Sequence, residues 1–138
     1  MLRRWILLLA APVLAGACND QPPLLAPDTA VLEGVSLHLS VNLSRGLSDA
    51  LVVRLAAPDS IVIPSSVVAD SVLVVNGSET WAAALTEALP RFPGYAVFFV
   101  NEGPSWPVGS IVDVFVTVRD GPRRRLLEAP RQQITIVW

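Results

Sequence analysis

Hydrophobic and polar residues alternate along much of this chain with the two-residue period of a β-strand. In residues 35–44, five aliphatic side chains alternate with five polar ones. Successive side chains of a strand point to opposite faces, so this pattern predicts a half-buried strand with a solvated outer face. Residues 51–55 and 111–118 repeat the pattern, and the second has a predicted core face made only of valines.

Turn signals divide the rest of the chain at short intervals. Asn76-Gly77 is a strong hairpin signal, and Asp120-Gly121 marks another turn. Runs of β-branched and aromatic residues between the turns predict further strands at residues 61–63, 67–68, 72–75, 95–100, 124–127 and 134–138.

Residues 79–89 fit two structures. Several apolar residues of this segment, from Trp81 to Leu89, would share one face of a helix that begins after Ser78 and ends before Pro90. The Asn-Gly turn instead favours a strand that pairs back onto residues 72–75. We favour the strand.

Short strands and frequent turns, with little helical pattern, predict an all-β fold. We expect an antiparallel β-sandwich of immunoglobulin-like type, with about 7–9 short strands, after an N-terminal signal segment. The two cysteines around a tryptophan that mark antibody domains are absent, so the prediction concerns architecture alone. A small β-barrel is the alternative.

The N-terminal segment has a different composition. Arg3 and Arg4 precede an apolar run, residues 5–14, which is followed by small residues and by Cys18, the chain's one cysteine. A positive start, a short apolar run and small residues are typical of an export signal, and the run is too short to span a bilayer. One cysteine also cannot form a disulfide within the chain, so an exported thiol needs another explanation.

The segment Leu14-Ala15-Gly16-Ala17-Cys18 resembles the lipobox of bacterial lipoproteins, although Ala15 stands where a larger aliphatic residue is usual. The resemblance implies a signal peptide over residues 1–17, cleaved before a lipidated Cys18, which would attach the mature chain to a membrane of the cell envelope. Residues 18–33 would then form a proline-rich tether, and residues 34–138 the folded domain. The leaflet stays open, and Val31 and Leu32 could already belong to the first strand.

An ordinary signal peptide, cleaved after Ala15 or Ala17, is the alternative and would leave a free thiol. Residues 106–110, Trp-Pro-Val-Gly-Ser before the valine strand, also resemble β-rich lipoproteins of unknown function from bacteria with GC-rich genomes. That resemblance implies no particular activity.

Charge excludes one class of partner. The whole chain has a formal net charge of −2, and removal of two signal arginines leaves eight arginines against twelve acidic residues. A modestly acidic chain has no general attraction to nucleic acid, so we expect no nucleic-acid partner.

Residues suited to catalysis are sparse. The one histidine, His38, lies among serines on a predicted outer face, and no Gly-x-Ser-x-Gly motif presents a nucleophile. A zinc site needs several His or Cys ligands, so we expect no metal and no cofactor. Asp113 is the one acidic residue in the middle of a strand, where it fits either an edge-strand charge or a binding site. We expect a protein that is not an enzyme.

Two features suit binding. Trp106 lies between Pro104 and Pro107, so it is either a rigid exposed contact, with Trp81 as a second aromatic, or a plug in one end of the sandwich. Arg123 and Arg125 follow a turn and could contact an acidic partner or lipid headgroups. We therefore expect a membrane-anchored binding or scaffolding module whose partner is another envelope protein or a glycan; a carbohydrate- or peptide-binding module that uses Trp106 is the alternative.

Overall fold

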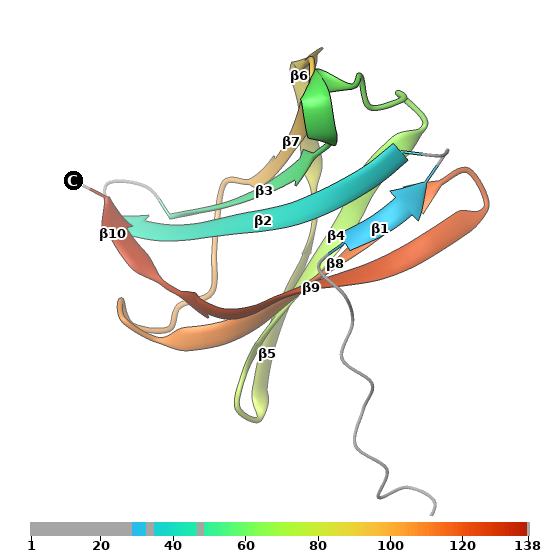
Figure 1. Cartoon of the computed structure of the whole chain (residues 1–138). Helices are drawn as coiled ribbons and strands as arrows, with labels where there is room; N and C mark the ends of the chain where they lie inside the picture. The colour runs from blue at the N-terminus through green and yellow to red at the C-terminus, as the bar shows by residue number, and fades with distance from the viewer. Residues whose placement is uncertain (1–28, 33–34, 47–48, 138) are drawn as a thin grey trace, which may run out of the picture.

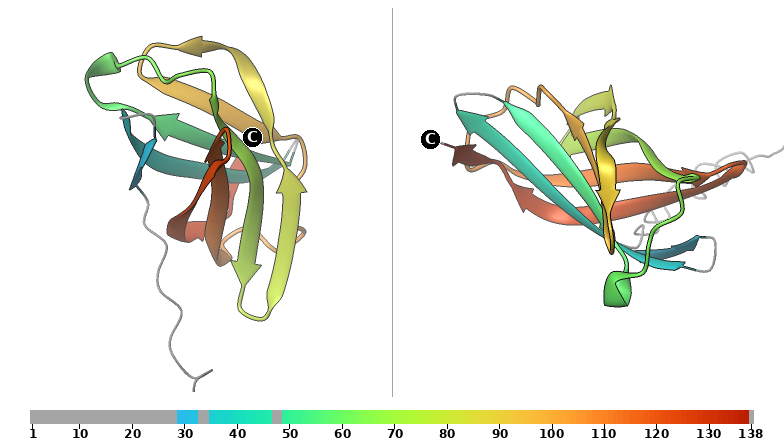
Figure 2. Two further views of the ribbon diagram at one scale, coloured as in Figure 1. Left: turned by 90° about the vertical axis from the view of Figure 1, so that its right-hand side faces the viewer. Right: turned by 90° about the horizontal axis from the view of Figure 1, so that it is seen from above.

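The computed structural model describes residues 29–32, 35–46 and 49–137, and these residues form an all-β domain of two facing sheets (Figures 1 and 2). Ten strands and one short 3₁₀ turn, η2 (Pro58–Ser60), make up the regular structure of this part of the chain. The predicted β-sandwich is confirmed, and the sheets do not close into a barrel.

Sheet A is built around the strand with the clearest alternation. In spatial order it contains β1 (Thr29–Leu32), β2 (Val35–Gly46), β3 (Ala50–Ala56), β7 (Tyr95–Val100) and β6 (Thr86–Phe92). These neighbours are antiparallel, whereas β10 (Thr135–Val137) pairs in parallel with the last residues of β2. Because β3 pairs with one edge of β2, the short strands β1 and β10 both pair with the opposite edge of β2, β1 near its start and β10 near its end.

Sheet B has the order β5 (Glu79–Ala84), β4 (Val67–Asn76), β8 (Ile111–Asp120) and β9 (Arg123–Gln133), all antiparallel. The chain passes from sheet B to sheet A at two places. At Leu85 it leaves β5 and enters β6, and at Ile134 it leaves β9 and enters β10. Both lateral sides of the sandwich are therefore linked by continuous chain.

The core lies between the two sheets and follows the predicted alternation. Leu37, Leu39 and Leu43 of β2 are buried, and so is the valine face of β8 from Val112 to Val118. Phe98 of β7 is the largest fully buried side chain in the described residues. The strand predicted for residues 79–89 is confirmed, although it is divided between the two sheets.

Two segments differ from the expectation. Residues 61–63 are not a strand: they lie between Pro58 and Pro64 in the connection from β3 to β4, where proline removes backbone donors that a sheet would use. Thr29–Leu32, within the expected tether, instead form β1. Cys18 and the expected signal segment lie outside the described residues.

Candidate binding surface

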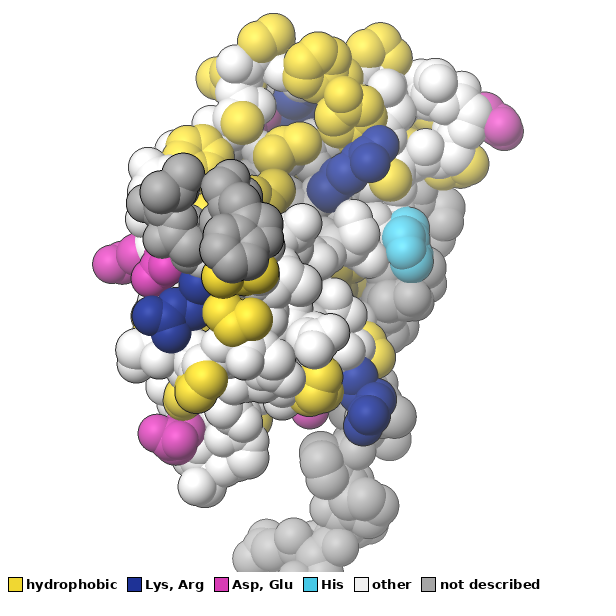
Figure 3. Space-filling view, turned by 90° about the vertical axis from the view of Figure 1, so that its left-hand side faces the viewer, with side chains coloured by type: hydrophobic (Ala, Val, Ile, Leu, Met, Phe, Trp, Pro, Cys, Tyr) yellow, Lys and Arg dark blue, Asp and Glu magenta, His cyan; other side chains and the backbone are white. Residues whose placement is uncertain are grey.

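One end of the sandwich carries a group of exposed hydrophobic side chains. Leu89 and Val62 are 76% and 67% exposed, and Phe92 and Ile61 are also exposed. We call these four residues the apolar tip. Hydrophobic side chains gather over this end of the molecule, near β6 and β7, at the top of the view in Figure 3. Large apolar patches on a soluble surface commonly mark interaction sites.

The connection between β3 and β4 is bent sharply onto the turn between β6 and β7. Asp59 and Ser60 adopt left-handed backbone conformations, with φ of 54° and 56°. The backbone N–H of Ala57 donates to the carbonyl of Gly94 at 2.7 Å. A Cβ at Gly94 would lie 3.1 Å from the Ser60 Cα, so glycine permits this close approach. Ile61 and Val62 are thereby carried to the same end as β6.

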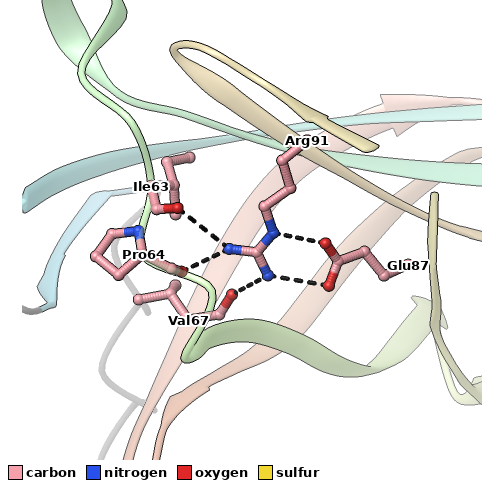
Figure 4. A network of polar contacts seen from close by, with 5 residues as sticks. All are labelled: Ile63, Pro64, Val67, Glu87 and Arg91. Carbon is pink, nitrogen blue, oxygen red and sulfur yellow. Dashed lines mark hydrogen bonds and ion pairs between the residues drawn. The ribbon is translucent and has the colours of Figure 1, made fainter. Parts of the chain in front are cut away.

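Arg91 of β6 fastens this connection in place (Figure 4). Its Nε and Nη2 donate to the two carboxylate oxygens of Glu87 at 2.5 and 3.0 Å. Its Nη1 donates to the carbonyls of Pro64 and Ile63 at 2.5 and 3.4 Å, and Nη2 also donates to the carbonyl of Val67 at 2.6 Å. The planar guanidinium suits this task because its donors form a fixed fork.

The Arg91–Glu87 pair is largely protected from water, since the two side chains are only 13% and 21% exposed. The network therefore joins β6 to the end of the β3–β4 connection and to the first residue of β4, with charge-assisted hydrogen bonds in a partly buried setting. The apolar tip thus rests on a fixed support.

A hollow of about 800 Å³ lies between this connection and β6. Its lining comprises Val62, Ile63, Pro64 and Ser65 on one side and Glu87, Leu89, Pro90 and Arg91 on the other. An aromatic group continues the surface: the rings of Phe92 and Tyr95 stack with centroids 5.1 Å apart, and the Arg54 guanidinium lies 4.2 Å from the Tyr95 centroid. The tip therefore combines aliphatic side chains, a hollow and an aromatic border.

The two predicted tryptophans face inwards. Trp106 is half-buried against the core, and its carbonyl and that of Ser105 accept hydrogen bonds from Arg45 Nη1 at 2.8 and 3.0 Å. Trp81 lies opposite Val74, on the inner face of sheet B, and is also half-buried against the core. The arrangement of Trp106 favours the plug interpretation over an exposed contact.

Asp113 lies on the outer face of sheet B, where its Oδ1 accepts a hydrogen bond of 3.0 Å from the backbone N–H of Arg131. Arg131 has φ of 54° at an irregularity in the β8–β9 pairing, so Asp113 satisfies a donor that the ladder leaves open. Nearby Glu128 is buried, and burial together with the negative charge of Asp113 raises its pKa.

Arg123 and Arg125 are exposed at the turn between β8 and β9, and His38 is exposed on sheet A. None of the residues predicted to bind belongs to the apolar tip. Sequence reasoning missed Ile61 and Val62 of the tip because the Ile-Val-Ile run at residues 61–63 has the composition of a strand. The flanking Pro58 and Pro64 were the signal against that interpretation.

The chain matches no protein-family model and no curated protein at a significant level. Within the described residues, no helix is long and apolar enough to cross a membrane. In the same part of the chain, no three His, Cys, Asp or Glu side chains come together in a way that could hold a metal ion.

Proposed function

We propose that this protein is a membrane-anchored lipoprotein of the bacterial cell envelope, held through lipid on Cys18, whose β-sandwich binds another envelope protein without catalysis. The apolar tip carries the proposal. It exposes four large hydrophobic side chains at one end, and the Arg91 network fastens the segment that presents two of them. A rigid apolar surface loses little entropy on binding, which favours recognition.

The chemistry of the tip favours a protein over a glycan or a bilayer. A sugar-binding surface relies on exposed aromatic faces with polar groups, whereas three of the four residues of the tip, Leu89, Val62 and Ile61, are aliphatic. Entry into a bilayer would also carry exposed Asp59, which directly precedes Ser60 and Ile61, towards the hydrocarbon, and a carboxylate is costly there. We therefore expect the partner to offer apolar side chains that fill the hollow beside Leu89.

A glycan- or peptide-binding module that uses Trp106 is the second candidate. The fourth residue of the tip offers some support for a ring-binding surface, because Phe92 is exposed and stacked on Tyr95. The half-buried position of Trp106 against the core weighs against its use as the main contact.

In-cell photo-crosslinking tests the proposal. A photoreactive residue at Leu89 of the full chain, expressed in its own host, should give a discrete protein adduct in the membrane fraction. The same residue at Val108, an exposed hydrophobic position on the connection before β8, is the matched control and should give none.

Two additional variants make the outcome specific. Val62→Asp should remove the Leu89 adduct, because it places a charge in the same hollow. Cys18→Ala should release the chain from the membrane or leave it unprocessed. An adduct that survives Val62→Asp, or equal adducts at Leu89 and Val108, would contradict binding through the tip; membrane retention of processed Cys18→Ala would contradict the lipid anchor.

A further inference from the structure

The outer face of sheet B is apolar at its centre, unlike the solvated outer face of β2. Leu73 and Leu126 are exposed there, and Phe115 is half-buried. An antiparallel sheet with one face on the core usually carries polar side chains on the other. This second apolar surface is independent of the tip and of the proposed function.

Large and small side chains on this face lie in adjacent rows. Leu73 and Phe115 are a cross-strand pair, and the next pair along the same strands is Ser71 and Thr117. A hollow of about 570 Å³ lies on this face, and its lining includes Ser71, Leu73, Phe115, Thr117 and Leu126. On β4 and β8, a row of large side chains therefore lies directly beside a row of small ones, and on β9 the exposed Leu126 continues the second row, next to Thr117.

Opposite charges border the two rows. On β8, Asp113 lies two residues before Phe115, and Arg119 lies two residues after Thr117. On β9, Arg124 pairs with Arg119 at the basic end, whereas the buried Glu128 pairs with Phe115 and lies within the row of large side chains. Arg119 already contacts Asp70 Oδ2 at 3.2 Å within the chain, but both side chains stay more than a third exposed.

We propose that a second copy of this chain packs on the outer face of sheet B through a two-fold axis that runs across the strands, between the two rows. This rotation sets each strand of one copy over the same strand of the other copy, with the two strands running in opposite directions. It sets Leu73 and Phe115 of one copy onto Ser71 and Thr117 of the other, in both directions. It also brings Asp113 of each copy over Arg119 of its partner, so the faces of β4 and β8 are complementary to themselves in shape and charge, and on β9 it sets Leu126 of each copy on Glu128 of the other.

The charge pattern selects this arrangement. A two-fold axis parallel to the strands and between β4 and β8 would instead place Asp113 and Arg119 over Val75 and Val68, their register partners, where neither charge meets an opposite one. An axis along β8 itself would place Asp113 over Asp113 and Arg119 over Arg119. Like charges held together in that way oppose association. Ala82 and Ala84 of β5 lie in the same rows and would allow two sheets to approach to the usual spacing of about 10 Å.

The size of the face indicates a weak dimer. Four strands spaced about 4.8 Å apart, and about six residues long at roughly 3.3 Å each, cover roughly 400 Å² of sheet per copy. A standard stable interface buries about 800 Å² per partner. Association would therefore be reversible in solution and strengthened wherever copies are confined together, because confinement raises the effective concentration.

Sedimentation equilibrium of the full chain and two charge variants tests the dimer. The wild type should show a reversible monomer–dimer equilibrium below about 1 mM. Arg119→Glu alone should be monomeric, because two carboxylates would meet across the axis. Asp113→Arg alone should also be monomeric, because two arginines would meet. An equal mixture of the two variants should dimerise again, since both cross-axis pairs become opposite in sign.

The mixture separates loss of the interface from loss of the fold, because unfolded variants would not rescue each other. Leu126→Glu should weaken the wild-type dimer at least tenfold, whereas Leu89→Glu, at the tip, should leave it unchanged. A wild type that stays monomeric at about 1 mM, single variants that still dimerise, a mixture without rescue, or a dimer lost with Leu89→Glu would each overturn the proposal.

Discussion

At the scale of single residues, Arg91 contributes to stability through hydrogen bonds that no other described side chain is placed to replace. Arg91→Ala removes the partner of Glu87 and leaves the carbonyls of Pro64 and Val67 without their donor. Loss of one member of a largely buried, hydrogen-bonded pair should lower the free energy of unfolding by about 2–4 kcal/mol. Urea denaturation measures this change.

The control for Arg91 is Arg124→Ala, an exposed arginine, which should change the free energy of unfolding by less than about 0.5 kcal/mol. Arg91→Lys should be intermediate, because an ammonium keeps the charge but cannot reproduce the fork. Equal stability of Arg91→Ala and Arg124→Ala would show that the network does not hold the segment before β4.

Glu128 gives stability a pH dependence of defined sign. Burial, and then the negative charge of Asp113, raises the pKa of Glu128 in the folded state above its ordinary value of 4.5. Folding therefore favours the protonated carboxyl, so the contribution of Glu128 is full below its unfolded pKa and is lost as pH rises through the folded pKa.

Glu128→Gln removes this titration. The variant should gain stability relative to the wild type as pH rises from about 4 to 7, with little difference at the acidic end. Urea denaturation of both proteins across this range gives the difference between their free energies of unfolding at each pH. The titration of all other groups is common to the two proteins and cancels in this difference. Glu102→Gln, in an exposed connection, should follow the wild type; a difference for Glu128→Gln that is flat or falls with pH would contradict the assigned burial.

At the scale of elements, the sequence predicted what repeats locally. Strict alternation identified β2, β3 and β8, because one buried face imposes a period of two over many residues. Asn76-Gly77 likewise identified the hairpin of β4 and β5. The change of sheet at Leu85 has no such local signature, because it depends on strand pairing: residues before Leu85 pair with β4, and residues after it pair with β7.

The candidate surfaces were less predictable than the strands for the same reason. Arginine usually lies at a protein surface, so nothing in the sequence marks Arg91 as part of a network. Its three carbonyl partners lie 24 to 28 positions away in the chain. Asp113 was expected to be an edge-strand charge or part of a binding site, and the first alternative is wrong because β8 lies inside sheet B, between β4 and β9. The sequence could not show that Asp113 caps Arg131, because that contact arises from an irregularity in the β8–β9 pairing.

At the scale of the whole molecule, Trp106 decides between the two candidate functions. The chain before β8 crosses from sheet A to sheet B, and Arg45 of β2 holds it through the carbonyls of Ser105 and Trp106. Gly109 and Ser110 also exchange backbone hydrogen bonds with Ile134, at the start of the return to sheet A. This connection therefore joins both sheets, with the Trp106 side chain packed against their common core.

Trp106→Ala should consequently lower the free energy of unfolding by about 2 kcal/mol, less than the cost of losing a fully buried tryptophan because the ring is half-buried. Val108→Ala, in the same connection but exposed, should cost less than about 0.5 kcal/mol. Thermal and urea denaturation of the two variants measure these costs. If Trp106→Ala instead keeps full stability, the ring contributes nothing to the core and is available to a ligand. That result would favour the glycan- or peptide-binding function over recognition of a protein through the apolar tip.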